Sequence, residues 1–353
     1  MSVCYPAREL QQFASTLFQR VGLAEERADI MAGVFLQADL LGFTTHGLQR
    51  VVSNLEWLQS GESRISGEPL VLSDRGNCFN WDAQYLPGPW VLTKAIEQAL
   101  QRIPEWGVVT ASIRRSQHIA CLAAYLPQII EAGYVAILTC STPGENTVSP
   151  QGGLDPLFSA NPLAFAAPAG DYPLLFDISM SVTAGAYVAR AKREKRNMPS
   201  ICLKGSDGKL SDDPQVFEQG GSILPLGGAD HGYKGAALSA MLEVLSMALG
   251  GYGRADESAR EDKEANSVFL QVIDPQAFGP RADFLRQAVA LSGLWEQNRS
   301  EDANPVRVPG QRAWAMRTRQ LREGVELYPS IMRDLQPWAE KLQVGLPAVM
   351  PRG

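Results

Sequence analysis

Apolar residues recur at intervals of three and four along the first part of the chain, from about residue 7 to residue 60. Leu10, Phe13 and Leu17 open this pattern. Such spacing places the apolar side chains on one face of a helix. No strand-like alternation interrupts it. The pattern predicts a helical N-terminal lobe over residues 1–72.

Short apolar runs alternate with helix-like stretches through the middle of the chain. The runs have the length of strands and are too short for typical helices. They lie at residues 108–113, 134–138, 174–178 and 268–273. The helix-like stretches lie at residues 89–101, 118–132, 182–195 and 234–249. This alternation predicts an α/β domain with a mixed sheet, over residues 73–298.

Prolines and polar residues gather after about residue 300, in EDANPVRVPGQR. This composition is typical of a loop. Two further helical stretches follow it, to about residue 342, and we expect the segment 299–353 to pack back on the N-terminal lobe. A chain of 353 residues exceeds the roughly 250 to 300 at which a single core stops growing, so two lobes are expected.

The charge balance and the cysteines narrow the function classes. A formal net charge of -6 argues against general affinity for nucleic acid or an anionic membrane. The basic stretch 190–196 is interpreted first as a solvated helix face and second as a docking patch for phosphate. Five cysteines without a C-x-x-C pair predict neither a disulfide framework nor a zinc site.

No stretch reaches the roughly 18 uninterrupted apolar residues of a membrane span, and MSVCYPARELQQF lacks an apolar signal core. We therefore expect a cytoplasmic enzyme that binds a small molecule, without a metal.

Common nucleotide and hydrolase motifs are absent: no G-x-G-x-x-G follows a predicted strand, and no Walker A segment, G-x-S-x-G or H-E-x-x-H occurs. A dinucleotide would not bind through a standard Rossmann turn.

His46 stands in GFTTHGLQRV, at the start of a predicted helix. Thr44 and Thr45 are natural N-caps, which would place His46 in the first turn. The helix dipole disfavours an imidazolium there, so the neutral ring can exchange a proton with a substrate. Arg50 would share the helix face and present its planar fork to a carboxylate. The alternative is a surface helix start with an incidental histidine and arginine.

Three other segments combine residues that suit a phosphate or a ribose. His118 follows RRSQ and opens a predicted helix, and Lys234 stands in the glycine-rich PLGGADHGYKGAAL. Asp177 ends the apolar run PLLFD, where its carboxylate could accept from a ribose hydroxyl or an amide. Each has a structural alternative, respectively a plain helix start, a glycine-rich helix entry and a helix cap.

Six groups of residues follow one another in a set order between residues 38 and 312. They are ADLLGFTTHGLQRV, RRSQHIACLAAY, ENTVSPQGG with PLFSANPLAFAAP, PLLFDIS, ILPLGGADHGYKG and VRVPGQR. In this order they resemble the malate/L-lactate dehydrogenase family, which includes ureidoglycolate dehydrogenase, diketogulonate reductase and the Δ1-piperideine-2-carboxylate/Δ1-pyrroline-2-carboxylate reductases.

The resemblance implies a fold distinct from Rossmann: a mainly antiparallel or mixed sheet domain that binds the cofactor, with a helical lobe built from both chain ends, in a homodimer. It implies that His46 exchanges the proton beside Thr45, and that Arg50 clamps the substrate carboxylate near Ala160. The implied cofactor is NAD(P)H, with NADP slightly favoured over NAD. Together with Lys234, the expected cofactor contacts are His118, Ile119, Ala120, Cys121, Leu122, Phe176, Asp177, Ile178, Pro309, Gly310, Gln311 and Arg312.

Within the family, HIACL, PLF-x-x-NP-x-AF-x-AP and PGQR look most like the cyclic ketimine reductases, which use NADPH. Thr45 replaces a serine of that subgroup, Ala160 a threonine and Tyr187 an aspartate. Thr45 keeps a hydroxyl, whereas the side chain of Ala160 cannot hydrogen-bond a substrate. If the aspartate orients the histidine, its role is lost or replaced here. One hypothesis is hydride transfer at C2 of a small 2-oxo, 2-hydroxy or cyclic 2-imino acid, and the other is a cofactor-binding relative with lost or altered catalysis.

Overall fold

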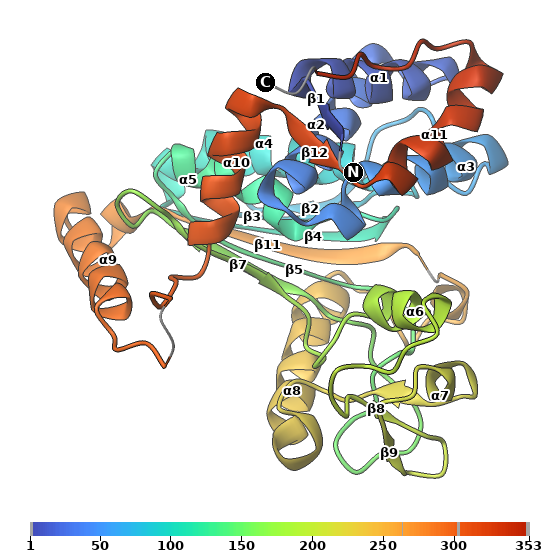
Figure 1. Ribbon diagram of the computed structural model, residues 1–353. Coiled ribbons are helices and arrows are strands. Elements are labelled where there is room, and N and C mark those ends of the chain that lie inside the picture. Colours follow the sequence, from blue (N-terminus) through green and yellow to red (C-terminus); the bar gives the residue numbers. More distant parts are fainter. Residues whose placement is uncertain (1–2, 263, 302–303, 351–353) are drawn as a thin grey trace.

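The computed structural model describes residues 3–262, 264–301 and 304–350. Figure 1 shows a helical lobe and a second lobe on opposite sides of a central sheet. The helical lobe begins with β1 (Val3–Tyr5), α1 (Ala7–Arg20), α2 (Glu25–Leu41) and α3 (Val51–Ser60). The periodic apolar residues of α1 are buried, which confirms the helical pattern predicted for this part of the chain.

The central sheet has seven strands, in the order β2-β3-β4-β11-β5-β6-β7. Every neighbouring pair is antiparallel except β3 with β4. The strands are β2 (Leu70–Asp74), β3 (Cys78–Asp82), β4 (Val108–Ser116), β5 (Val135–Ser141), β6 (Leu163–Ala167), β7 (Leu174–Ile178) and β11 (Asn266–Ile273). This confirms the predicted mainly antiparallel sheet, distinct from Rossmann.

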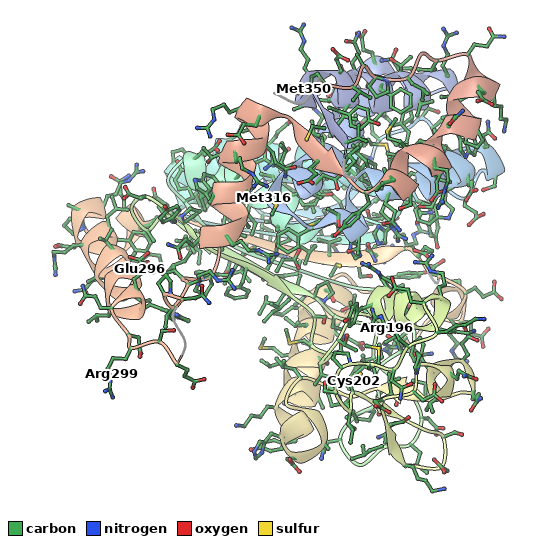
Figure 2. All side chains as sticks on the ribbon, viewed as in Figure 1. Arg196, Cys202, Glu296, Arg299, Met316 and Met350 are labelled. Carbon is green, nitrogen blue, oxygen red and sulfur yellow. The ribbon has the colours of Figure 1, made fainter. Side chains whose placement is uncertain are left out.

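Helices cover both faces of the sheet. On one face, α4 (Gly88–Trp106) supplies the crossover that the parallel pair requires and packs on β4 and β11, near α5 (Leu126–Glu131). The second lobe lies on the other face (Figure 1) and has its own hydrophobic cluster, which includes Cys202 (Figure 2). Its elements are α6 (Gly185–Arg193), β8 (Leu203–Lys204), β9 (Leu210–Ser211), α7 (Gln215–Glu218), β10 (Ser222–Ile223) and α8 (Gly228–Glu243).

Both chain ends contribute to the helical lobe. Strand β12 (Val325–Leu327) pairs with β1, α10 (Gln311–Glu323) packs on α2, and α11 (Pro329–Leu342) packs on α1 and α3. The side-chain amide of Gln320 donates to the carbonyl of Asp39 at 2.9 Å, which ties α10 to the last turn of α2. The lobe boundary expected at residue 72 falls inside β2, because that strand already belongs to the sheet.

Helix α9 (Arg281–Glu296) projects from the rest of the molecule (Figure 1). Every residue of this helix keeps part of its surface exposed. The exposed residues include large apolar ones, such as Leu294 at 69% exposure and Trp295 at 42%. Apolar surface of this kind is normally covered by another element or another chain.

Residues 118–132 do not form the single helix that the sequence predicts. Strand β4 runs beyond its predicted end, and a loop follows before a 3-10 turn, Leu122–Tyr125, and α5. Ala120 has a φ of 63°, outside the range of a right-handed helix, and the backbone N–H of Ile119 donates to the side chain of Asn266 at 2.9 Å. His118 therefore lies in a loop and not at a helix start.

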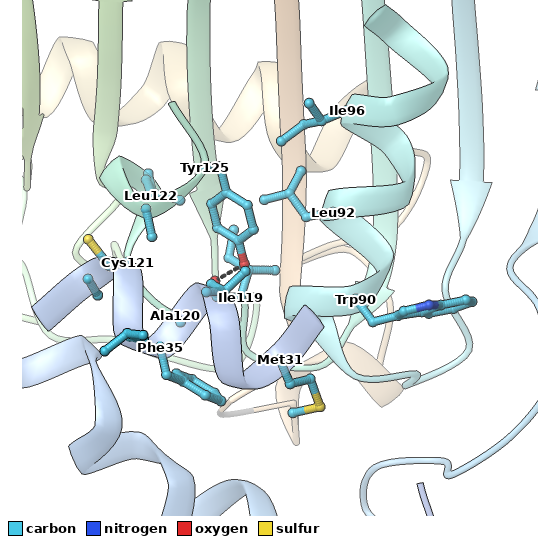
Figure 3. Close-up of a cluster of buried hydrophobic side chains, with 14 of the residues drawn as sticks. Met31, Phe35, Trp90, Leu92, Ile96, Ile119, Ala120, Cys121, Leu122 and Tyr125 are labelled. Atoms are coloured by element: carbon cyan, nitrogen blue, oxygen red, sulfur yellow. Dashed lines mark hydrogen bonds between the residues drawn. The ribbon is translucent and has the colours of Figure 1, made fainter. Parts of the chain in front are cut away.

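A buried tyrosine supports this loop from the core. Figure 3 shows Tyr125 among apolar side chains of α2, α4 and the loop, with its hydroxyl hydrogen-bonded to the carbonyl of Ile119. Tyr125 is almost completely buried. The bond satisfies a main-chain carbonyl that the surrounding apolar side chains could not.

Replacing Tyr125 by Phe should therefore lower the free energy of unfolding by roughly 1 to 3 kcal/mol, because the Ile119 carbonyl loses its partner in a buried place. Urea unfolding followed by circular dichroism measures the change. Tyr172→Phe, at a partly exposed position, is the matched control and should change stability by less than about 0.5 kcal/mol. Equal stability of the two variants would show that the Tyr125 bond does not hold the loop.

Candidate active site

His46 ends the first of two short 3-10 segments, and does not lie in the first turn of an α-helix. The segments are Thr44–His46 and Leu48–Arg50, and α3 follows the second. Gly47 separates them with a ψ of -140°, which interrupts the predicted helix. The threonines do not cap a helix either, because the Thr45 hydroxyl lies 2.9 Å from Nδ1 of His46.

The buried carboxylate of Asp39, on α2, explains this interruption. Its Oδ2 accepts the backbone N–H of Leu48 at 2.7 Å, and so takes the capping role predicted for the threonines. A Cβ at position 47 would collide with the same carboxylate, so only glycine fits there. Burial raises the pKa of Asp39 to about 7. Helix α2 thus fixes the turn that carries His46 and Arg50.

His118 lies beside His46. Their rings are stacked, with centroids 5.9 Å apart and planes 13° apart, and the ring of Trp57 lies 6.2 Å from that of His118. Nδ1 of His118 accepts the backbone N–H of Ala120 at 3.1 Å, so the neutral ring carries its proton on Nε2. The sequence predicted His118 as a cofactor contact, and the structure places it next to the candidate catalytic histidine.

The surroundings keep both imidazoles neutral at pH 7. Burial, followed by the positive charge of Arg50, lowers the pKa of His46 to about 4. The same two causes, and then His46 itself, hold the pKa of His118 well below its ordinary value. A helix dipole was expected to keep His46 neutral, whereas burial and the charge of Arg50 lower its pKa here. A neutral ring can accept a proton on one nitrogen or donate from the other.

Arg50 completes this group. Its guanidinium carbon lies 5.9 Å from the centre of the Trp57 ring, and Nη2 forms an ion pair with Glu264 at 3.3 Å. Its Nε is buried and has no hydrogen-bond partner among the residues that the structure describes. The Nε–H side of the guanidinium, which we call the free edge, therefore keeps a donor that no described residue uses.

Position 160, predicted to contact the substrate, has only its main chain hydrogen-bonded. The carbonyl of Ala160 accepts the N–H of Met180 at 2.9 Å, and its amide faces the carboxylate of Glu145. Burial and then the charge of Glu264 raise the pKa of Glu145. Neither carboxylate was predicted as a site residue: Glu145 opens the segment ENTVSPQGG without a role assigned to it, and 214 positions separate Glu264 from Arg50.

Tyr187, which stands where the cyclic ketimine reductases are expected to carry aspartate, lies on α6 in the second lobe. The guanidinium of Arg196 lies 5.0 Å from the centre of its ring. Arg190 and Arg196 both form ion pairs with Glu194, at 2.7 Å each. These ion pairs lie at the surface, as expected of a solvated helix face.

Three segments predicted to contact the cofactor meet at the β7 edge of the sheet. The carboxylate of Asp177 accepts the N–H of Ala123 at 2.9 Å and lies 3.4 Å from the Cys121 thiol. On the free edge of the same strand, the N–H of Leu175 donates to the carbonyl of Pro309 at 3.1 Å. These contacts bring together residues 118–122, 176–178 and 309–312.

Asp177 already accepts an amide from within the protein. Its carboxylate caps the 3-10 turn that follows Cys121, and not the helix that follows Asp177 in sequence. Burial raises the pKa of Asp177, and the backbone N–H groups of this turn oppose the rise. The alternative interpretation, a cap for the helix that follows Asp177, is therefore wrong, and the contact of Asp177 with the cofactor stays a prediction.

The joined segments fit a nicotinamide dinucleotide. Gly310 has a φ of 95°, and a Cβ there would lie 2.8 Å from the Pro173 carbonyl, so glycine allows the 309–312 loop to approach β7 closely. Arg312 is exposed in the first turn of α10, where a guanidinium and a helix N-terminus suit a phosphate. Ile178, 45% exposed, offers apolar surface on the same strand as Phe176.

Two residues predicted to contact the cofactor, Gln311 and Lys234, contact other residues of the chain. Gln311 accepts the N–H of Val308 and donates to Glu296 at 3.0 Å, so its side chain is used within the chain. Lys234 is exposed on α8 in the second lobe, 5.9 Å from the centre of the Tyr233 ring. The hydrogen bonds that join the other segments do not include Lys234.

His46, His118 and Arg50 do not line the cavity of about 640 Å³ in the helical lobe. Residues of α1, α2 and α10, together with Met350, line that cavity. Within the described ranges, no helix is both long and apolar enough to cross a membrane.

The chain matches the malate/L-lactate dehydrogenase family over residues 5–336. It is 32% identical to Δ1-pyrroline-2-carboxylate/Δ1-piperideine-2-carboxylate reductase of Pseudomonas putida, over 94% of this chain and 95% of that protein. It is 29% identical to (2R)-3-sulfolactate dehydrogenase (NADP(+)) of Chromohalobacter salexigens, over 96% and 99%.

The fold is that of malate dehydrogenase from Entamoeba histolytica, whose crystal structure superposes with a TM-score of 0.91 at 20% identity and covers 99% of this chain and 100% of that one. The match over residues 5–336 takes in the His46 turn, all seven strands of the central sheet and the Pro309 loop. The chain therefore belongs to the malate/L-lactate dehydrogenase family of dehydrogenases and reductases.

Proposed function

We propose that this protein is an NAD(P)-dependent oxidoreductase that transfers a hydride to or from C2 of a small 2-oxo, 2-hydroxy or cyclic 2-imino acid. The observation that carries the proposal is the neutral His46, held by its turn next to a guanidinium with one free edge. A proton-exchanging group and a carboxylate-binding group at one place are what this reaction requires of the protein.

The residues divide the work as follows. Arg50 binds the substrate carboxylate and so orients C2. During oxidation the neutral His46 takes the proton from the oxygen or nitrogen on C2 and becomes an imidazolium. During reduction the ring must first gain a proton from solvent, and the imidazolium then gives it to that oxygen or nitrogen. Thr45 and the stacked His118 hold the His46 ring in place. The nicotinamide supplies or receives the hydride when it is bound along the β7 edge.

NADP is proposed in preference to NAD. Arg312 is exposed at the start of α10 and can meet a 2′-phosphate, whereas Arg190 and Arg196 already share Glu194. The Chromohalobacter relative is an NADP(+) enzyme by name, which supports this preference. Titration of NADH and NADPH fluorescence compares the two cofactors directly.

We further propose a cytoplasmic location and a homodimer. All five cysteines lie within the described residues and are free thiols, as expected in a reducing compartment. The projecting α9 presents Leu291 and Leu294 to solvent, and a second copy of the chain would bury such a surface.

His46→Ala should lower kcat by about 10²- to 10⁴-fold, because the proton transfer loses its positioned group. The cofactor affinity should change by less than about threefold. The assay uses pyruvate, oxaloacetate, Δ1-piperideine-2-carboxylate and Δ1-pyrroline-2-carboxylate with the tighter cofactor.

The control is His231→Ala, which changes an exposed histidine of α8 and should retain wild-type kcat. Near-normal turnover of His46→Ala would remove His46 from its role. Cofactor binding by the wild type without turnover of any substrate would identify a relative with lost or altered catalysis, which the changes at Ala160 and Tyr187 favour.

Arg50→Gln should raise the pKa of His46 above about 4, since the neighbouring positive charge contributes to the lowered value. Burial should still keep it below the ordinary value of a histidine. Imidazole NMR titration can follow this, because the chain has only three histidines. Arg20→Gln, at an exposed position on α1, should leave the titration unchanged, and an unchanged His46 in Arg50→Gln would show that the two groups are not coupled.

Changing Leu291 and Leu294 together to Glu should convert a dimer to a monomer, because charges would face the apolar surface of the partner. Size-exclusion chromatography with light scattering measures the mass. Gln287→Glu adds one charge to the same exposed helix and should leave the dimer intact. A dimer that survives the double change would place the interface elsewhere.

A further inference from the structure

The ion pair between Arg50 and Glu264 sets the charge of the site before a substrate enters. Nη2 of Arg50 lies 3.3 Å from Oε2 of Glu264, and the Glu264 side chain is 47% exposed. The neighbouring Nε of Arg50 is buried and lacks a hydrogen-bond partner in the described part of the chain. A substrate carboxylate that binds this free edge therefore lies beside a carboxylate of the protein.

Contacts on both sides of Glu264 hold it in this place. The N–H of Gly144 donates to the carbonyl of Asp262 at 3.1 Å, and a Cβ at Gly144 would come within 2.8 Å of the Asp262 main chain. Asn266, at the start of β11, accepts the N–H of Ile119 in the loop of His118. The position of Glu264 is thus tied to the sheet and to the histidine loop.

Apart from its partner Arg50, two charged groups that the structure describes near this site, Arg254 and Glu145, do not offset the charge of Glu264. Arg254 is in bidentate contact with Glu243, with both distances 2.7 Å, so its charge is already matched. Glu145 lies close enough to Glu264 for its pKa to be raised by that charge. His46 is neutral at pH 7. A second negative charge on a substrate would meet the carboxylates without a free cation among these groups.

We propose that Glu264 selects substrates with one carboxylate and a protonated imine nitrogen, and disfavours substrates with a second carboxylate. The inference rests on the proposed function. In a 2-imino acid the carboxylate and the nitrogen are both bonded through C2, so a carboxylate on the free edge of Arg50 brings the N–H close to Glu264. A second carboxylate in the same region would be repelled.

The chemistry of such a substrate balances without a further reagent. A hydride from the reduced cofactor adds to C2 of the protonated imine and forms a C–H bond. The π electrons of the C=N bond become a lone pair on nitrogen, and the cofactor leaves oxidised. Glu264 stabilises the cation that accepts the hydride and takes no part in bond making.

The first test is the ratio of kcat/KM for Δ1-piperideine-2-carboxylate to that for oxaloacetate, in the wild type and in Glu264→Gln. Glutamine keeps the size and removes the charge. The ratio should fall by about tenfold or more, since one charge contact is lost for the imine and one repulsion is lost for the dianion. Glu261→Gln, at an exposed site on the same segment, should leave the ratio unchanged. An unchanged ratio in Glu264→Gln would overturn the proposal.

The second test measures binding alone, by calorimetry in the presence of the reduced cofactor so that no turnover occurs. The probes are L-pipecolate, which carries a carboxylate and a cationic nitrogen, and pyrrole-2-carboxylate, which carries only the negative charge. The wild type should prefer L-pipecolate, and Glu264→Gln should lose about tenfold of that preference. If no panel substrate is turned over while this preference shift is seen, the proposed function fails and the role of Glu264 stands. A wild type without the preference overturns the role of Glu264.

Discussion

The buried carboxylate of Asp39 is the constraint on which the site depends. It accepts the N–H of Leu48 and leaves space only for glycine at position 47, so it determines where the 3-10 segments break. The main chain of Asp39 is itself held by Gln320, which lies 281 positions later in α10. The pKa of about 7 means that the acid is neutral below that pH, and Oδ2 can accept from Leu48 in either state. Both ends of the chain are therefore needed to present His46.

The antiparallel register brings the other site segments to one end of the sheet. β4 ends at Ser116 opposite Asn266, where β11 begins, and β5 ends beside them. Antiparallel neighbours run in opposite directions, so the end of one strand coincides with the start of the next. The loop of His118 and the segments of Glu145 and Glu264 all leave the sheet there. A Rossmann sheet places its ligands at the carboxyl ends of parallel strands, which explains why this chain needs no glycine fingerprint.

Periodicity predicted the N-terminal helices, and short apolar runs predicted four central strands, of which β5 and β11 are buried along nearly their whole length. It did not predict β2, whose five residues are all exposed and so show no alternation. The sequence paired His46 with Arg50 on one helix face, but they lie in two separate 3-10 segments, so their nearness depends on the turn at Gly47 and not on helical spacing. The capping by Asp39, the stacking of His118 and the Glu264 ion pair could not be predicted from the sequence, since each depends on a tertiary contact. The family segments include His46 and His118 but not Glu264, and the sheet register places the loops of His118 and Glu264 at one end of the sheet.

The departures at Ala160 and Tyr187 bear on how His46 is kept neutral. The main-chain carbonyl of Ala160 is hydrogen-bonded, and Tyr187 lies against Arg196 in the second lobe. The group next to Nδ1 of His46 is instead the hydroxyl of Thr45. An aspartate at Nδ1 would favour the imidazolium and raise the pKa of the ring, whereas a hydroxyl adds no charge. With Arg50 nearby and no carboxylate in the described residues bonded to its ring, His46 stays neutral over the whole physiological range. Such a ring accepts a proton from a hydroxy or amino acid without first losing one, and returns it when the direction reverses.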